Sequence, residues 1–396
     1  MRGVGLYLGV VQFLFALCWI VYVIYLPQLA AQAGIAKGAV AWILMADQLV
    51  FVFADYASGV AADRVSRVVG RVGLAVLAAT VVSCLAFLAL PLIAPGGSPV
   101  VFIALTMLWA ATSSALRAPP LALLGRHVAQ PSQPLLLALT LLGLGIANAL
   151  APYLGLTLRG VDPRLPFALS SGALALVTLG LVVAERGLAR ARVREAVAGP
   201  APAAARAAAE GFAPAPIFIV AAVFAALAFQ VHVFIDSAPL YLRQASAAQL
   251  PTLLPVFWIG FNIGMVPMAF AVKRWPAPRV MATAAVAAAL GSVLATLAGT
   301  LPLLVAAQLA AGAAWAGVLV AAFSWALARG GASGAGAFAG ALSSVLALAT
   351  LGRMASVSAG WPKSPLLAPA FEWWPLVGWL AAGAVIALAV LRRRPA

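Results

Sequence analysis

Ionisable side chains that stand inside long apolar stretches are the residues of this sequence with the clearest chemistry. Asp47 is followed directly by Gln48, and His232 precedes Asp236 by four positions, a spacing that places both on one face of a helix. At membrane depth an ionisable group costs several kcal/mol unless it is paired or hydrated, so such groups mark proton, ion or substrate sites. We therefore expect Asp47, Gln48, His232 and Asp236 to serve in proton coupling or substrate binding. The alternative is structural: His232 as a hydrogen-bonded residue of the helix packing, and Asp47 as a partner of a nearby Ser or Gln.

Amide and aromatic side chains extend this set of candidate contacts. Gln230, Asn262 and Trp315 stand on apolar stretches and are candidates to line a solute path, although single residues of these types more often pack. No basic cluster is evident that would capture a phosphate or a dicarboxylate. We therefore expect the solute to be small and mostly neutral or amphipathic.

A soft metal ion is the alternative cargo. Met265 and Met268 flank Pro267, and together with His232 they would offer thioether and imidazole ligands, which suit monovalent copper. Methionines three positions apart also occur in ordinary helix packing. We keep a copper or other metal-ion importer as the second hypothesis, with His232, Met265 and Met268 as its candidate ligands.

The elements that carry these residues are long apolar segments. Hydrophobic residues make up 65% of the 396-residue chain, charged residues make up 8%, and the mean hydropathy is +1.09. Hydrocarbon offers the backbone no hydrogen-bond partner, so each stretch of about 20 apolar residues is stable there only as a helix. The composition excludes a water-soluble globule and predicts an all-α polytopic membrane protein.

Twelve transmembrane helices are predicted, at residues 5–29, 38–58, 72–94, 99–117, 134–158, 165–186, 216–242, 251–272, 278–298, 301–328, 334–357 and 373–391. Residues 186–215, rich in Ala, Pro and Arg, are expected to form a flexible cytoplasmic linker. They separate an N-terminal six-helix bundle, 1–185, from a C-terminal six-helix bundle, 216–396. The triplet Pro27, Gln32 and Ala33 recurs as Pro239, Gln244 and Ala245, which favours two pseudo-symmetric repeats.

The net charge of +15 is interpreted as a topology signal. The basic residues stand between apolar segments and form no stripe on one face, so a nucleic-acid partner is not expected. If both termini are cytoplasmic, all basic residues except Arg353 and a small outer set lie inside. The outer set is Lys37, Arg159, Arg164, Arg243 and Lys363. We expect a multi-pass protein of a bacterial cytoplasmic (inner) membrane, since the high Ala, Arg and Gly content suggests a GC-rich bacterial source.

Enzyme signatures are missing from the sequence. It contains no GxxxxGK[ST] phosphate loop, so ATP hydrolysis within the chain is excluded, and it contains no HExxH motif or paired-carboxylate site. His127 and His232 are its two histidines, whereas a lipid-modifying membrane enzyme would be expected to carry clusters of His or Asp. We expect no enzymatic activity and no cofactor, and we keep a channel or a polytopic lipid-modifying enzyme as remote alternatives.

The segment between the second and third predicted helices reads GVAADRVSRVVGR, from Gly59 to Arg71. It resembles the signature loop of the major facilitator superfamily, in which Gly, then Asp-Arg, then Gly and basic residues connect the same two helices. The resemblance implies that Asp63 faces the positive N-terminal end of the eleventh helix. It also implies that Arg64, Arg67 and Arg71 supply ion pairs or phospholipid contacts, and that the loop, with Gly59, locks the cytoplasmic side.

The family's helix arrangement implies two further pairs of charges. Because the eleventh helix lies beside the second and the seventh in that arrangement, Arg353 is expected to bridge to Asp47 or Asp236 as an outer gate. The alternative is that Arg353 and Asp236 extend to the membrane surface. The second and fourth helices also pack together, so Asp55 and Arg117 are secondary candidates, with a structural ion pair as the alternative to a functional role.

The resemblance implies the fold of the major facilitator superfamily and secondary active transport by alternating access. We expect a monomer in contact with membrane lipids that moves a small solute around a midplane site. Protons are the expected coupling ion, because an imidazole or a buried carboxylate can bind and release a proton near neutral pH.

Overall fold

The chain is built from helices throughout the part that the structure describes. The computed structural model describes residues 2–66, 68–197 and 215–391, and no strand occurs in these ranges. Within them, 11 helical stretches are long and apolar enough to cross a membrane. The prediction of an all-α polytopic membrane protein is confirmed.

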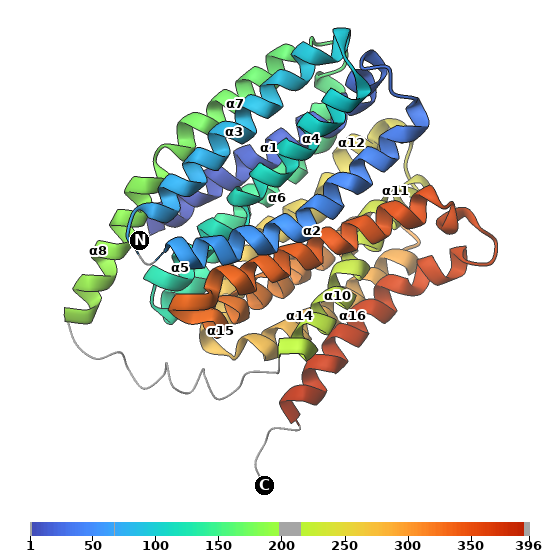
Figure 1. Cartoon of the computed structure of the whole chain (residues 1–396). Helices are drawn as coiled ribbons and strands as arrows, with labels where there is room; N and C mark the ends of the chain where they lie inside the picture. Colours follow the sequence, from blue (N-terminus) through green and yellow to red (C-terminus); the bar gives the residue numbers. More distant parts are fainter. Residues whose placement is uncertain (1, 67, 198–214, 392–396) are drawn as a thin grey trace.

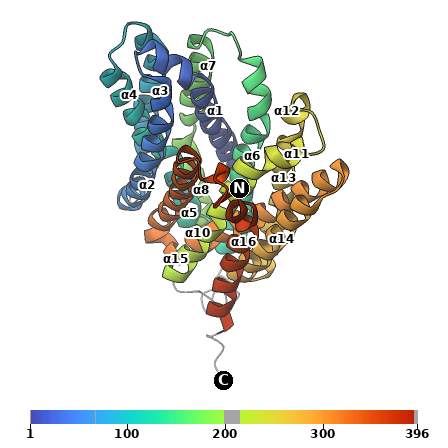
Figure 2. The same cartoon turned by 90° about the vertical axis from the view of Figure 1, so that its right-hand side faces the viewer.

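We refer to the residues up to 197 as the N-terminal half and to those from 215 as the C-terminal half. The helices of the N-terminal half are α1 (Arg2–Gln32), α2 (Val40–Val65), α3 (Arg71–Ile93), α4 (Pro99–Ser113), η3 (Ser114–Leu116), α5 (Ala118–His127), α6 (Gln133–Thr157), α7 (Arg164–Thr178) and α8 (Leu181–Val197). In this half α3, α4 and α7 pack together (Figures 1 and 2). Two of these helices, α3 and α7, lie along the upper left edge of the molecule in Figure 1.

The helices of the C-terminal half are α10 (Ala215–Val231), the π-helix η5 (His232–Asp236), α11 (Ser237–Leu242), α12 (Leu250–Leu253), α13 (Pro255–Arg274), α14 (Ala277–Leu297), α15 (Leu301–Ser358) and α16 (Ala368–Leu391). In this half, α16 lies along the lower right edge of the molecule in Figure 1. The π-helix interrupts what was predicted as one helix over residues 216–242. Such single turns of wider helix recur at functional sites.

The fourth predicted helix is longer than expected. It was predicted to end at Arg117, but the helical path continues through η3 and α5 to His127. Pro119 and Pro120 lie in the first turn of α5, where a missing N–H costs no intrahelical hydrogen bond, and both are buried. The double proline therefore starts a helix here instead of ending one.

The 58-residue helix α15 folds back on itself at Gly331. Gly331 has φ 56° and ψ −147°, a conformation that glycine adopts without a steric penalty. The rings of Trp325 and Phe338 lie 5.8 Å apart, whereas thirteen residues of straight helix would separate them by about 20 Å. We call residues 301–330 the first arm and residues 332–358 the second arm. The turn predicted over 329–333 is thus confined to one non-helical residue.

The two halves meet most closely where α2 runs beside the second arm of α15 (Figure 1). A Cβ atom on Gly59 would overlap the backbone carbonyl of Gly336, so only glycine permits this approach. Further along the same contact, the hydroxyl of Ser344 donates a hydrogen bond of 2.6 Å to the carbonyl of Val52. A second contact between the halves joins α6 to α13. These contacts place polar residues of both halves around a shared interior.

The first prediction concerns the crossing of α2 and α15. Gly59→Ala is expected to destabilise the protein by about 1–3 kcal/mol, because the added methyl group forces two backbones apart. The measurement is the free energy of unfolding in mixed micelles. Gly172→Ala is the matched control, since Gly172 is exposed on a helix and a Cβ there meets no atom within 4 Å. Equal stability of the two variants would contradict the proposed close packing.

Candidate functional site: a polar cavity between the two halves

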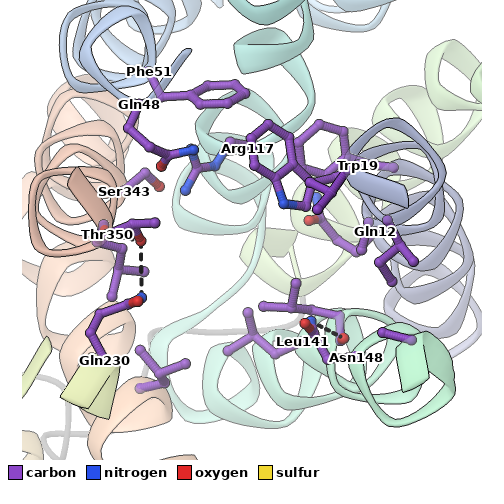
Figure 3. Close-up of a pocket in the computed structure, with 18 of the residues that line it drawn as sticks. Gln12, Trp19, Gln48, Phe51, Arg117, Leu141, Asn148, Gln230, Ser343 and Thr350 are labelled. Atoms are coloured by element: carbon purple, nitrogen blue, oxygen red, sulfur yellow. Dashed lines mark hydrogen bonds between the residues drawn. The ribbon is translucent and has the colours of Figure 1, made fainter. Parts of the chain in front are cut away.

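A cavity of about 440 Å³ lies between the two halves (Figure 3). Most of its wall is apolar, with Trp19, Leu141 and Leu144 among the lining side chains. The polar side chains that line it are Gln12, Gln48, Arg117, Thr140, Asn148, Gln230, Ser343, Thr350 and Arg353. They come from α1, α2, α6, α10, the second arm of α15 and the single residue between η3 and α5. The volume falls within the range of about 300–1,000 Å³ that small-molecule sites occupy.

Arg353 belongs to a hydrogen-bonded group on the wall formed by the C-terminal half. Its Nε donates to the Oε1 atom of Gln230 at 2.8 Å, and the Nε2 of Gln230 donates to the Oγ1 of Thr350 at 2.9 Å. The guanidinium carbon lies 4.9 Å from the ring centre of Phe234, a cation–π distance. Gln230, a secondary candidate from sequence, is therefore the residue that orients the guanidinium.

The expected outer gate is not formed in this structure. Arg353 contacts Gln230 and Phe234, and the described hydrogen bonds and ion pairs give it neither Asp47 nor Asp236 as a partner. Asp47 is fully buried and takes no part in the cavity lining. Asp236, at the end of the π-helix, also lies outside that lining. Which helices are neighbours does not fix the direction of a side chain, and here Arg353 points to Gln230 and Phe234. A gate that breaks and reforms between states stays a prediction.

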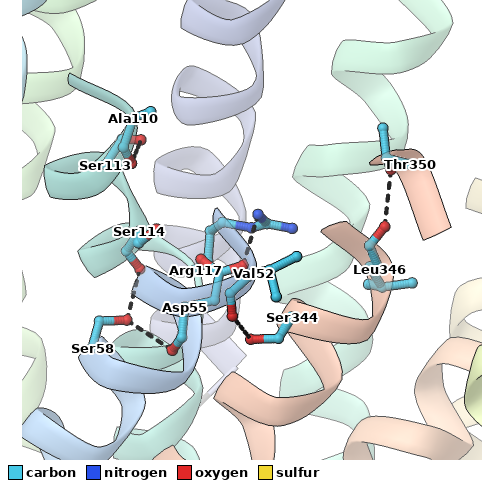
Figure 4. Close-up of polar contacts among 10 residues, drawn as sticks. All are labelled: Val52, Asp55, Ser58, Ala110, Ser113, Ser114, Arg117, Ser344, Leu346 and Thr350. Carbon is cyan, nitrogen blue, oxygen red and sulfur yellow. Dashed lines mark hydrogen bonds and ion pairs between the residues drawn. The ribbon is translucent and has the colours of Figure 1, made fainter. Parts of the chain in front are cut away.

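Asp55 and Arg117 form an ion pair on the wall formed by the N-terminal half (Figure 4). The Oδ2 of Asp55 lies 2.7 Å from the Nη1 of Arg117, and the carboxylate side chain is fully buried. The Arg117 guanidinium also lies 5.0 Å from the ring centre of Phe51. Since Arg117 lines the cavity and Asp55 lies behind it, the carboxylate neutralises this arginine without entering the solute path.

Asp47 is a buried carboxylate with one described hydrogen-bond donor. The hydroxyl of Tyr22 donates to its Oδ2 at 2.7 Å, and its Oδ1 has no hydrogen-bond partner among the described residues. Trp109 packs on Tyr22 with 4.6 Å between the ring centres. Gln48, the next residue, does line the cavity, because consecutive residues on a helix point about 100° apart. Asp47 therefore lies in the packed core of the N-terminal half and Gln48 in the cavity wall, although the sequence predicted one site for both.

His232 lies in the core of the C-terminal half and does not line the cavity. Its Nε2 lies 3.0 Å from the Oε1 of Gln308, and Gln308 in turn donates to the hydroxyl of Ser237 at 3.3 Å. Ser237 closes the ring by donating to the His232 carbonyl at 2.8 Å. Trp379 packs against the imidazole, 5.3 Å between the ring centres. The structure favours the structural interpretation of this histidine over the proton- or substrate-binding one.

The other candidates on the C-terminal helices are packing residues. Trp315 stacks on Phe229, with ring centres 4.3 Å apart. The amide of Asn262 donates to the carbonyl of Trp258 at 2.9 Å and faces α6 across the contact between the halves. Met265 is fully buried, and neither it nor Met268 lines the cavity. The Met268 sulfur lies beside Gly317, whereas His232 contacts Gln308, about 13 Å away along the first arm of α15. Met268 and His232 therefore do not share one site.

The side-chain carboxylate of Asp63 joins the two halves by accepting hydrogen bonds from backbone amides. Its Oδ1 accepts from the Gly336 amide at 2.8 Å and its Oδ2 accepts from the Ala337 amide at 2.7 Å. These amides lie near the start of the second arm of α15, the helix end that the loop resemblance implied. Arg64 and Arg71 are exposed to solvent. Arg67 lies outside the residues that the structure describes.

Arg126 is a contact between the halves that sequence reasoning missed. Its Nη1 donates to the hydroxyl of Ser66 at 2.7 Å and to the carbonyl of Ala332 at 3.1 Å. In the sequence Arg126 counted only as one basic residue in a loop. Gln12, Ser343 and Thr350 in the cavity were missed as well. Gln12 had a usable signal as a lone amide in an apolar segment, whereas serine and threonine are too common in membrane helices to stand out.

Long apolar helices that enclose a cavity lined by polar residues of two halves define a multi-pass membrane transport protein. The family model of the Major Facilitator Superfamily matches residues 8–352, and the chain belongs to this family. The identification made from the loop between the second and third helices is thereby confirmed. No curated protein resembles the chain closely enough in sequence to be counted as a relative.

Solved structures of transporters share the fold. The crystal structure of a human organic anion transporter is 15% identical, with 99% of each chain covered and a TM-score of 0.66. The Escherichia coli fucose:proton symporter is 15% identical, with 98% of each chain covered and a TM-score of 0.64. A proton:xylose symporter is 12% identical, with 98% of this chain and 94% of that chain covered and a TM-score of 0.71. Identities this low show a shared fold and leave the solute open.

The second prediction tests the ion pair on the cavity wall. Arg117→Gln is expected to destabilise the protein by about 3–5 kcal/mol, because it leaves the buried carboxylate of Asp55 without a counter-charge. The double variant Asp55→Asn/Arg117→Gln should recover much of this loss, since it removes both charges. The measurement is a double-mutant cycle on the free energy of unfolding. Additive effects of the two single changes would show that the pair contributes no coupling energy.

Proposed function

We propose that this protein is a secondary active transporter that moves a small solute across a bacterial cytoplasmic membrane by alternating access. The observation that carries the proposal is the position of the contacts between the halves. Among the described hydrogen bonds that join them, one lies at mid-helix, between Ser344 and Val52. The others lie at the end of the molecule that contains Asp63 and Arg126. The cavity is thus held shut at one end, as one state of an alternating-access cycle requires.

The distribution of charge supports a cytoplasmic position for the closed end. The loop with Arg64 and Arg71 lies there, and basic residues mark loops that stay in the cytoplasm. We count the two arms of α15 as separate crossings and so propose twelve in all, with both termini on the cytoplasmic side. We assign residues 1–185 and 216–396 to two six-helix bundles. α8 extends to Val197 and so enters the predicted linker 186–215, most of which lies outside the described residues.

Protons are the proposed coupling ion, and Asp47 is the proposed proton carrier. An ionised carboxylate in a membrane interior requires a counter-charge or water, yet the described partner of Asp47 is a neutral hydroxyl. The site therefore suits a carboxylic acid that binds a proton in one state and releases it in another. Two of the solved structures of like fold carry the name of proton symporters, which supports the same mechanism.

No observation favours the alternative functions over transport of an organic solute. The candidate copper ligands are dispersed, as described above. No group of three or more His, Cys, Asp or Glu side chains suited to a metal ion occurs in the described residues. Membership of a transporter family points away from an enzyme. A cavity closed at one end by backbone hydrogen bonds suits a carrier better than a channel, which needs a continuous path.

The third prediction tests alternating access with pairs of spin labels. One pair, Val69→Cys with Lys273→Cys, reports on the Asp63 end, and another, Lys37→Cys with Ala247→Cys, reports on the opposite end. Both pairs are placed on a background in which the two native cysteines are alanine. Alternating access predicts two distance populations at each end that change in opposite directions.

Asp63→Asn should shift these populations about tenfold or more toward opening at the Asp63 end, because each hydrogen bond to a charged group contributes about 1.5–3 kcal/mol. Asp162→Asn is the matched control, since Asp162 is exposed in a loop at the opposite end. A single distance at both ends, unchanged by Asp63→Asn, would contradict both alternating access and the proposed lock.

The fourth prediction tests the proton carrier in proteoliposomes. Asp47→Asn is expected to retain exchange of labelled solute across the membrane but to lose accumulation driven by a pH gradient, because an amide cannot carry the proton. Tyr22→Phe is the matched control, since it removes the hydrogen bond to Asp47 but keeps the acid. Accumulation by Asp47→Asn at the wild-type level would rule out Asp47 as the carrier.

A further inference from the structure

The charges around the cavity do not balance. Arg117 and Arg353 line it, and no Asp or Glu is among its lining residues in the described part of the chain. Asp55 neutralises Arg117 from behind at 2.7 Å. Arg353 has an amide and an aromatic ring as its described partners, so one positive charge of the cavity remains without an anion.

The geometry of Arg353 leaves its charge available to a ligand. The Nε atom is engaged by Gln230, and no described hydrogen bond uses either Nη atom. Gln230 is itself held by Thr350, so the guanidinium is oriented before any ligand arrives. The N–H groups of the two Nη atoms lie in one plane and remain free to donate to the two oxygens of a carboxylate.

Retaining such a group has an energetic cost. Arg353 is partly buried, and a charge that is partly withdrawn from water is stabilised less without a counter-ion than with one. The π face of Phe234 offsets part of this cost, but it does not supply a negative charge. A bound anion would complete the compensation, and the Gln230 and Thr350 side chains would restrict where its charged group lies.

We propose that the transported solute is an organic monoanion whose carboxylate binds the Nη atoms of Arg353 and whose apolar body lies along the cavity. The inference rests on the proposed transport function and adds the class of solute to it. One uncompensated arginine fits one negative charge. The body of the solute would lie against Phe234, Trp19, Leu141 and Leu144, which line the same space.

Of the neutral and the amphipathic solute expected from the sequence, this inference favours the amphipathic one and adds a negative charge to it. That expectation rested on finding no cluster of basic residues in the sequence. Arg117 and Arg353 are far apart along the chain, and the fold brings them to walls of one cavity from different halves. A largely apolar wall disfavours inorganic phosphate or sulfate, whose oxygens require hydrogen bonds on all sides.

The test compares ligands that differ only in charge. The melting temperature of the purified protein would be measured against 4-phenylbutyrate, 4-phenylbutan-1-ol and 4-phenylbutylamine, against the acid, alcohol and amine of shorter and longer chains, and against inorganic phosphate. A ligand that binds the folded state raises the melting temperature in a saturable manner. We expect saturable stabilisation by carboxylates alone.

Variants of Arg353 assign that binding to the guanidinium. Arg353→Gln should weaken carboxylate binding about 30-fold or more, and Arg353→Lys should weaken it less, because lysine keeps the charge but loses the planar pair of donors. Arg159→Gln, which changes an exposed arginine outside the cavity, should bind like the wild type. Since Arg353→Lys keeps the charge, it also controls for a folding defect in Arg353→Gln.

The inference is overturned if the carboxylates stabilise the protein no more than the alcohols and amines do, or if inorganic phosphate alone stabilises it. It is also overturned if Arg353→Gln binds the carboxylates as tightly as the wild type does. Its failure is distinguishable from failure of the transport proposal. If the spin-label distances change in opposite directions at the two ends but no carboxylate is preferred, transport stands and the solute class is wrong. If the distances do not change, the transport proposal fails whichever ligand binds.

Discussion

The carboxylate of Asp63 reaches from α2 to the backbone of the second arm of α15 and joins the two halves at one end of the molecule. A side chain can bind backbone amides of another helix only where the two backbones approach closely, and Gly59 and Gly336 make that possible. Arg126 adds a hydrogen bond to the carbonyl of Ala332 at the same place. Amide and carbonyl groups of the α15 backbone are therefore both used: two amides donate to a carboxylate, and a carbonyl accepts from a guanidinium.

Hydropathy was sufficient to predict the helices, because an apolar segment that crosses hydrocarbon must form its backbone hydrogen bonds within itself, as a helix does. It failed where local signals are ambiguous. Pro119 and Pro120 suggest a helix end, but prolines are equally suited to a first turn, and the burial that decides between these outcomes is not visible in the sequence. The flexible run around Gly331 was predicted as a loop, yet a change of direction there needs one residue of positive φ.

The candidate site was predicted less well than the fold, and the reason is geometric. The loop from Gly59 to Arg71 could be assigned because its residues are contiguous and resemble a known motif. The cavity could not, since an apolar helix carries no pattern that tells which face meets the other half. His232 was expected in the cavity, but its partner Gln308 belongs to a helix distant in sequence. Arg353 was paired with a carboxylate because opposite charges suggest pairing, whereas the structure pairs it with an amide.

The second arm of α15 carries the Asp63 contact near one end and Arg353 near the other, about 26 Å apart along a helix. Ser344 lies between them and touches α2 through the Val52 carbonyl, so it is placed as a pivot. If the arm tilts by about 10° around that pivot, its two ends move in opposite directions by about 2 Å each. The tilt of this one helix would then break the hydrogen bonds of Asp63 at one end and move Arg353 at the other. Binding of the solute and opening of the Asp63 end would be parts of one rigid motion.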